Sequence, residues 1–315
     1  MPQSLPYELE SPAVPPVEEI AALASRAEGA DGDPPFSDQT LVDLRSTPAG
    51  RVGTVLARAS GGELVGAAVR VHEPDDDSQL VELVVDPGHR RRGIGTALAG
   101  ALADESAGES AGTVRAWAHG GHPGAAVLAA RHGLVPVRDL HRLLRPLGEA
   151  PDLPLPEEMP AGFRLRAFEP GRDEDEWLRV NAAAFADHPE QGRMTLEDLR
   201  QREAEPWFDP AGFLLAVRAE DPATVAGFHW TKVHSGDDGE AALGEVYAVG
   251  VSPEHQGTGL GRALTAAGVN HLARRGLAEV MLYVDGDNRA ALRLYERLGF
   301  RPWHLDVMYA RTASA

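Results

Sequence analysis

The sequence predicts a mixed α/β fold, an α+β arrangement with a mixed sheet, in two tandem domains. Three observations carry this prediction: the chain length, the alternation of strand and helix patterns, and an internal repeat. The chain has 315 residues, which suits two domains of about 150 residues better than one. Each half alternates short apolar runs with amphipathic stretches, the pattern typical of helices packed on a central sheet.

The repeat consists of a hydrophobic strand, a proline and a glycine-rich turn that leads into a helix. It occupies Leu83–Ala103 and again Val249–Ala273. Matching positions such as Gly93 and Gly259 are 166 residues apart. A constant offset of this kind indicates a duplicated domain.

The elements of the first half follow from its runs of Val, Leu and Ala. Valine-rich runs predict strands near 64–72, 79–85 and 113–118. Alanine-rich amphipathic stretches predict helices near 91–103 and 123–132. The first of these helices is expected to begin at the glycine turn itself.

The second half repeats this order after a proline-rich segment. Strands are expected near 213–218, 225–233, 245–251 and 279–284, and helices near 173–185, 196–205, 261–274 and 289–298. The segment from Pro146 to Gly162 has five prolines among acidic residues and no amphipathic period, as in an extended linker. The predicted boundaries are therefore 1–148 for the first domain, 149–162 for the linker and 163–315 for the second domain.

Composition excludes several classes of function. The formal net charge of −18 disfavours nucleic acid and anionic membranes, which require a basic surface, and suits a small cationic amine. The chain has no cysteine, so disulfides, thiolate metal sites and a cysteine nucleophile are excluded. No metal-ligand spacing stands out among the histidines, and no apolar run is long enough to span a membrane. We therefore expect a cytoplasmic protein without a metal. A monomer is expected as well, although no feature of the composition specifies the oligomeric state.

The glycine turn is a candidate phosphate site. A strand that leads through Arg/Gln-x-x-Gly-x-Gly into a helix presents unpaired backbone N–H groups in one concave turn, and the glycines allow close approach. There is no Gly-Lys-Ser/Thr of a nucleoside-triphosphate P-loop, and no clear acidic ribose partner of a dinucleotide site. A tight packing turn is the structural alternative for a single copy.

The two turns resemble the signature of the GNAT family of acetyl-CoA-dependent N-acetyltransferases. A second family pattern, Asn-x-x-Ala-x-x-x-Tyr-x-x-x-Gly-Phe, runs from Asn288 to Phe300. The resemblance covers both halves and implies two tandem GNAT acyl-CoA N-acyltransferase domains that bind one acetyl-CoA (coenzyme A) each. The coenzyme-binding residues that it implies are Leu83, Val84, Val85, Arg91, Arg92, Gly93, Ile94, Gly95 and Thr96 in the first copy, and Val249, Gly250, Val251, Gln256, Gly257, Thr258, Gly259, Leu260, Gly261, Arg262, Asn288, Arg289, Ala290, Ala291, Leu292 and Arg293 in the second.

The two copies differ where acetyl transfer needs an acid and a base. An attacking amine must lose a proton, and the departing thiolate is helped by a proton donor. Glu245 and Tyr295 are the candidates, and their counterparts at the constant offset are Gln79 and Ala129. Glu82 is a possible substitute carboxylate, but it lies three residues from Gln79, on the opposite face of a regular strand. We therefore expect the second domain to catalyse, and the first to bind acetyl-CoA without turnover.

The substrate side of the second half resembles one tandem-domain GNAT subgroup of actinobacteria. Its members acetylate the cysteinyl amine of a small molecule, a cysteinyl-glucosaminyl-inositol conjugate. The resemblance extends over nearly the whole chain. It implies substrate contacts from Asp38, Glu190, Lys232, Glu245 and Tyr283. The subgroup more often has Glu at the position of Asp38, whose side chain is shorter.

Two other functions remain open from the sequence. A tandem GNAT enzyme could acetylate another small amine, such as an aminoglycoside or a peptide N-terminus. A coenzyme A sensor would bind at both turns and catalyse at neither. The pair Glu245 and Tyr295 argues against a sensor, which needs neither residue.

Overall fold

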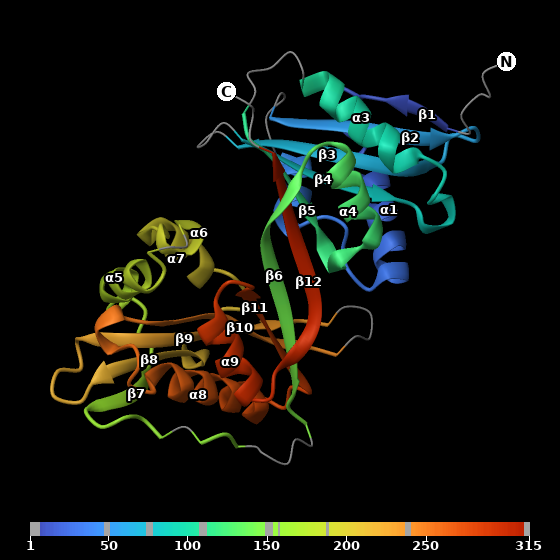
Figure 1. Ribbon diagram of the computed structural model, residues 1–315. Helices are drawn as coiled ribbons and strands as arrows, with labels where there is room; N and C mark the ends of the chain where they lie inside the picture. The colour runs from blue at the N-terminus through green and yellow to red at the C-terminus, as the bar shows by residue number, and fades with distance from the viewer. Residues whose placement is uncertain are drawn as a thin grey trace. The chain divides into compact units, whose positions relative to one another are not determined.

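The computed structural model describes residues 7–46, 51–73, 78–106, 112–148, 154–156, 158–186, 189–236 and 241–311 (Figure 1). The chain divides into two compact units. The first unit comprises Met1–His141, Asp285–Asp287 and His304–Ala315, and the second unit comprises Arg142–Val284 and Asn288–Trp303. The end of the chain thus groups with the first unit, whereas the sequence boundary assigned it to the second domain.

The first unit is a mixed sheet with helices on both faces. Its elements are β1 (Tyr7–Glu10), α1 (Val17–Asp31), α2 (Asp38–Ser46), β2 (Val52–Ala59), β3 (Leu64–Glu73), β4 (Ser78–Val85), α3 (Ile94–Ser106), β5 (Val114–Ala118) and α4 (Pro123–Arg131). Strands β1 to β4 pair antiparallel in chain order, and β4 pairs parallel with β5. The other edge of β5 pairs with Val307–Arg311, the end of β12 (Arg301–Arg311), so the C-terminal strand completes this sheet.

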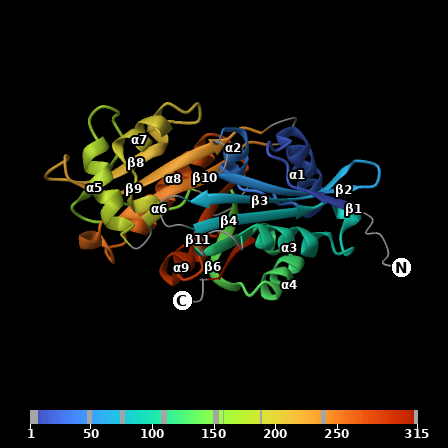
Figure 2. The same cartoon turned by 90° about the horizontal axis from the view of Figure 1, so that it is seen from above.

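Two apolar clusters in the first unit explain the position of its helices. Helix α1 buries Ile20 and Leu23 with Leu56 on one face of the sheet. Helix α3 buries Leu98 with Val55 on the other. Figure 2 shows α1 and α3 on opposite sides of strands β2 to β4. The phosphate-type turn between β4 and α3 therefore lies on the α3 side.

The second unit repeats this plan. Its elements are the end of β6 (Val135–Pro146), β7 (Phe163–Ala167), α5 (Glu174–Ala184), α6 (Pro189–Gly192), α7 (Leu196–Glu203), β8 (Phe213–Arg218), β9 (Val225–His234), β10 (Leu243–Val251), α8 (Leu260–Arg274), β11 (Glu279–Asp285), α9 (Arg289–Arg297) and the start of β12. Strands β7 to β10 pair antiparallel, and β10 pairs parallel with β11.

Aromatic side chains fill one face of the second sheet. Trp230 stacks on Phe213 at a centroid distance of 4.3 Å, and Trp177 of α5 meets both edge to face. Helix α8 buries Val269 and Leu272 on the other face. The two faces of the sheet thus carry different apolar cores. The polar residues of β9 and β10 lie beyond the aromatic core along these strands.

The internal repeat is present in the fold. Helices α3 and α8 begin at Ile94 and Leu260, and α4 and α9 begin at Pro123 and Arg289, both pairs at the offset of 166 found in the sequence. In each unit the turn follows the strand that pairs parallel with the next one. The prediction of a duplicated mixed α/β fold is confirmed.

Some element predictions were incomplete. The helix expected from Arg91 begins at Ile94, because Arg91 (φ 62°) and Gly93 (φ 86°) have left-handed backbone that ends helical geometry. Strands β1, β2, β6, β7 and β12 and helices α1, α2 and α6 were not predicted. Strands β6 and β12 carry several charged side chains without a clean apolar alternation, so the period-two signal is weak there.

The proline-rich segment is anchored at one point. Residues 149–153 and 157 of the predicted linker lie outside the described residues. Leu155 is buried, and its backbone N–H and C=O both bond to the Asn270 side chain at 2.8 Å. Asn270 on α8 therefore holds this part of the segment against the second unit.

In the parts of the chain that the structure describes, no helix combines the length and apolar character needed to cross a membrane. The same residues include no group of three or more His, Cys, Asp or Glu side chains arranged to hold a metal ion.

Candidate functional site

Both glycine turns have the same backbone architecture. Left-handed residues occur at Arg91 and Gly93 in the first turn, and at Gly257 and Gly259 in the second. Each turn ends where a helix starts, so the first amides of the helix have no partner within it and point toward the turn. Such a helix start favours phosphate oxygens, by hydrogen bonding and through the helix dipole.

A side-chain brace common to both turns was missed in the sequence. The guanidinium Nε of Arg90 donates to the carbonyl of Val85 at 3.0 Å. The amide Nε2 of Gln256, at the equivalent position, donates to the carbonyl of Val251 at 3.3 Å. The signal was available, since Arg90 and Gln256 share the offset of the repeat. Each brace ties the first residue of the motif to the end of its strand.

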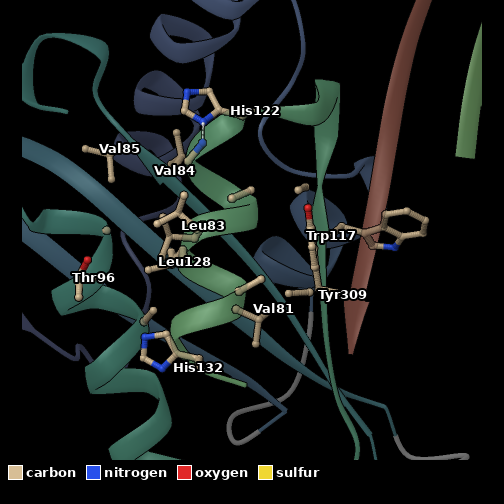
Figure 3. Close-up of a pocket in the computed structure, with 18 of the residues that line it drawn as sticks. Val81, Leu83, Val84, Val85, Thr96, Trp117, His122, Leu128, His132 and Tyr309 are labelled. Carbon is tan, nitrogen blue, oxygen red and sulfur yellow. Dashed lines mark hydrogen bonds between the residues drawn. The ribbon is translucent and has the colours of Figure 1, made fainter. Parts of the chain in front are cut away.

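The first turn opens into a cavity of about 920 Å³ (Figure 3). Among the residues predicted to bind coenzyme, those that line it are Leu83, Val84, Val85, Arg91, Gly93, Ile94, Gly95 and Thr96. Arg92 instead donates to the carbonyl of Gly88 at 3.0 Å. The far wall comes from β5 and α4, whose Leu128 lies beside Leu83 in Figure 3. The volume lies within the usual range of about 300 to 1,000 Å³ for ligand pockets.

The lining of this cavity is mostly apolar, and its charged groups are more often basic than acidic. The charged lining residues are Asp31, Asp33, Arg70, Arg90, Arg91, His119, Arg131 and Arg311. Arg90 is paired with Asp31 through two bonds of 2.6 and 2.7 Å. An excess of guanidinium groups, in a chain whose net charge is −18, complements an anionic ligand locally.

In the second unit, three polar side chains share one face of the sheet. Lys232 and Glu245 are directly opposite each other on β9 and β10, and His234 lies two residues beyond Lys232 on the same face. The Nε2 atom of His234 is 2.6 Å from Oε2 of Glu245. Lys232 lies over the rings of Trp207 and Tyr247, at 5.2 and 5.7 Å.

This polar face borders a second cavity. Its volume is about 300 Å³, and Trp207, Lys232 and His234 are among its lining residues. Glu245 is 7% exposed, whereas the His234 side chain is 36% exposed. A polar ligand in the cavity would therefore meet Lys232 and His234 first. Sequence reasoning missed His234 as the partner of Glu245, although its spacing from Lys232 on one strand was a usable signal.

Strand β10 carries a bulge beside Glu245. Val246 pairs with Thr231 and Ala248 pairs with Trp230, so Tyr247 is an extra residue on β10. Bulges bend a strand and redirect its side chains, and they are over-represented next to active sites. The Tyr247 hydroxyl accepts a bond of 2.9 Å from Nε of Arg202. The ladder between β9 and β10 continues on both sides of the bulge, which lies between the aromatic pair at Trp230 and the polar pair at Lys232.

Tyr283 belongs to the same face as Glu245. Met281 on β11 is the register partner of Glu245, and Tyr283 lies two residues further along β11. The Tyr283 residue is 43% exposed. Tyr283 is thus accessible on the face that carries Glu245. Asp38 begins α2 and Glu190 lies in α6, but their side chains fall outside the described residues.

Tyr295 lies in a packed core on the other side of β10. It is 6% exposed, in one cluster with Val246, the neighbour of Glu245, and its ring meets Phe300 edge to face at 5.7 Å. Burial raises the pKa of Tyr295 above its ordinary value, so its hydroxyl stays protonated at neutral pH. Asn288 caps the same helix by accepting a bond of 3.1 Å from the amide of Ala291.

The first unit has other residues at the positions of the acid and the base. Ala129 takes the place of Tyr295, and Gln79, which is 6% exposed, takes that of Glu245. The alternative carboxylate, Glu82, is 1% exposed. Its oxygens accept bonds from the amide of Ser37, at 3.1 and 3.2 Å, and lie 2.7 Å from Nε2 of His119. Glu82 is thus more buried than Glu245 and has an additional contact from the Ser37 amide.

His119 links Glu82 to the end of β12. Its Nδ1 atom is 3.5 Å from Asp306, whose carboxylate also accepts a bond of 2.9 Å from the amide of Gly120. Burial lowers the pKa of His119, but hydrogen bonds and charge interactions with Asp306 and Glu82 outweigh it and raise the pKa to about 9. The imidazolium form is therefore favoured in the folded protein at neutral pH.

The raised pKa of His119 predicts a pH-dependent stability. The stabilisation is fully present below the unfolded pKa of about 6.5 and is lost as the pH rises through about 9. We expect the free energy of unfolding to fall by on the order of 3 kcal/mol over this range. Urea titrations at pH 6 and pH 9.5, followed by tryptophan fluorescence, measure the fall. An equal fall in His119→Gln would contradict the assignment.

The chain is similar in sequence to proteins of one known family. The profile of the acetyltransferase (GNAT) family matches residues 17–133 and 177–300. A mycothiol acetyltransferase of Kocuria rhizophila is 59% identical over 94% of this chain and 96% of its own length. One from Thermobispora bispora is 55% identical over 93% and 95%.

Solved structures show the same tandem architecture. A GCN5-related N-acetyltransferase from Sphaerobacter thermophilus is 28% identical, with a TM-score of 0.72, and the match covers 97% of this chain and 95% of that one. A tandem GNAT protein from the clavulanic acid biosynthesis pathway has a TM-score of 0.70 over 98% of this chain and 99% of that one. At 22% identity the latter likeness concerns the fold alone.

Proposed function

The chain belongs to the GNAT acetyltransferase family, and we propose that this N-acetyltransferase acetylates the cysteinyl amine of the cysteine–glucosamine–inositol precursor of mycothiol. The observation that carries the proposal is the identity of 48 to 59% with several mycothiol acetyltransferases over more than nine-tenths of this chain. The reaction would be the last step of mycothiol formation. The contact of Glu245 with His234, which lines the second cavity, supports an amine substrate.

The residues of the second unit supply the proton transfers. Glu245 would take the proton of the substrate ammonium on a carboxylate oxygen, directly or through one water. The free amine then forms the new N–C bond as the thioester C–S bond breaks, and the second proton that the nitrogen loses passes through solvent to replace the one that Tyr295 gives up. Tyr295 would donate its phenolic proton to the departing sulfur, a role that fits a hydroxyl kept protonated by burial.

The second turn would hold the coenzyme, which supplies an acetyl thioester. The start of α8 and the amides of Gly257–Arg262 suit its phosphates. Val249–Val251 at the end of β10 lead into this turn, and Asn288–Arg293 at the start of α9 are proposed as further coenzyme contacts by resemblance. The small residues at this turn leave room for close approach.

We further propose that the first unit binds a second acetyl-CoA without turning it over. The basic lining beside the first turn and the cavity of about 920 Å³ support binding. Ala129 and Gln79 provide neither an acid nor a base, which supports the absence of turnover. A monomeric state and a cytoplasmic location stay predictions.

Substrate recognition would use the polar face of the second unit. Lys232 and Tyr283 can hydrogen-bond the hydroxyls of a sugar–inositol unit, and Glu245 can hold the ammonium. Asp38 and Glu190 are proposed as further contacts, by resemblance. No metal is needed for this chemistry.

His234 is proposed to position Glu245. We expect His234→Ala to lower kcat about tenfold, because the carboxylate loses the partner at 2.6 Å that orients it. His234→Gln, whose amide can occupy the place of Nε2, is expected to keep most of the activity. Steady-state kinetics of both variants from pH 6 to pH 9 measure the effect. Equal loss in both variants would show that the contact has no positioning role.

The substrate assignment is tested by an acetyl-transfer assay that offers the cysteine conjugate beside unrelated amines. The amines include an aminoglycoside and a peptide with a free N-terminus. We expect transfer to the cysteine conjugate, with a kcat/KM at least about a hundredfold above the others. Transfer to the unrelated amines alone would refute the substrate and leave the enzyme class intact.

A further inference from the structure

The two units differ most in the space between the sheet and the last helix of each repeat. In the second unit this space is a packed core that buries Leu282, Tyr295 and Phe300, which are 1, 6 and 3% exposed. The residues at the same positions of the repeat in the first unit are Ala116, Ala129 and Leu134. All three of these smaller residues line the cavity of about 920 Å³.

Two further positions also have smaller side chains in the first unit than in the second. Val269 and Val284 belong to the second core, and their counterparts Ala103 and Ala118 both line the first cavity. Strand β5 is only partly buried along its whole length, whereas most of β11 is fully buried. The first unit thus has a hollow in place of the second unit's core.

The hollow is continuous with the phosphate-type turn. One and the same cavity is lined by Gly93 and Thr96 at the turn and by Leu102 and Val114 at the far ends of α3 and β5. The turn end offers backbone amides and guanidinium groups. Further along α3 and β5 the wall is mostly aliphatic, although Arg311 of β12 lies opposite Val114 and also lines the cavity. An amphiphilic thioester fits this lining when its phosphates lie at the turn and its acyl chain covers the aliphatic wall.

We propose that the first unit binds coenzyme A thioesters with acyl chains of several carbons in preference to acetyl-CoA. The inference rests on the proposed coenzyme site of the first unit and extends it to the acyl group. An acetyl group leaves much apolar wall uncovered, while each further methylene that is buried strengthens binding by up to about fourfold. No transfer is implied, because the acid and the base are absent from this unit.

A full-length chain with the second turn blocked tests this proposal. Gly261→Glu adds a carboxylate at the start of α8, where it repels phosphate, and a Cβ there meets Val251 at an ordinary distance of 3.7 Å. Calorimetric titrations of this variant use coenzyme A, acetyl-CoA and hexanoyl-CoA. We expect hexanoyl-CoA to bind at least about tenfold more tightly than acetyl-CoA.

Filling the hollow should remove that preference. Ala129→Tyr introduces the side chain that Tyr295 has in the second unit, and Ala116→Leu introduces that of Leu282. Either variant alone tests the proposal if the other does not fold. Both should bring the affinity ratio of hexanoyl-CoA to acetyl-CoA close to one. An equal affinity for the two thioesters before filling, or a preference unchanged after filling, would overturn the inference and leave the coenzyme site in place. Failure of all three ligands to bind would instead overturn the first-unit coenzyme site itself.

Discussion

Glu245→Gln is expected to lower kcat by about 10² to 10⁴-fold while acetyl-CoA binding is retained. The amide keeps the size of the side chain and its place opposite Lys232, but it cannot accept the ammonium proton. Because the substrate amine is protonated at neutral pH, the loss should shrink as the pH rises toward the pKa of the amine. Steady-state rates from pH 7 to pH 10, with coenzyme affinity from calorimetry, measure both effects.

A matched control separates this loss from a general charge effect. Glu279 is an exposed carboxylate at the start of β11 in the same unit, and Glu279→Gln is expected to keep its full rate. A loss below about fivefold in Glu245→Gln would remove Glu245 as the base. Equal losses in the two variants would point to the net charge of the unit.

Tyr295→Phe is expected to lower kcat by about 10²-fold with little change in stability. Phenylalanine keeps the ring that packs on Phe300 but has no proton to give to the departing sulfur. The melting temperature checks the packing, and pre-steady-state acetyl transfer measures the chemical step. Since burial raises the pKa of Tyr295, the wild-type rate should show no alkaline loss from this residue below about pH 10.

A result near the wild-type rate, in a variant that melts normally, would assign proton donation to water. A large fall in melting temperature would instead show that the hydroxyl is structural. The proposed role of Tyr295 requires the rate to fall and the melting temperature to stay.

The repeat made the fold and the coenzyme turn predictable from the sequence. Gly93, Gly257 and Gly259 lie where the backbone is left-handed. Because glycine adopts this conformation readily, the glycines of the motif predict the backbone geometry of the turn. Arg91 is the exception, since it adopts φ 62° without being glycine, at an expected strain of about 1 to 2 kcal/mol. Because an arginine gives no sign of left-handed backbone in the sequence, α3 was predicted to start at Arg91 instead of Ile94.

Partners that lie in distant segments could not be predicted. The pairing of β5 with the end of β12 joins residues far apart in the sequence, and no local pattern specifies that partner. The same holds for His119, whose raised pKa depends on Asp306 in that strand. His234 was within reach, because strand alternation places it on the face of Lys232 and Glu245.

The central claim is that the chain has two coenzyme sites and one catalytic unit. It is tested most directly by counting bound acetyl-CoA per chain, and measuring transfer, in the wild type and in the matched variants Gly95→Glu and Gly261→Glu. A Cβ at these glycines has its nearest neighbour at an ordinary 3.6 and 3.7 Å, respectively, so a Cβ is accommodated without a clash at both positions. We expect two equivalents in the wild type, one in each variant, and loss of transfer in Gly261→Glu alone. One equivalent in the wild type, or loss of transfer in a folded Gly95→Glu, would contradict the central claim.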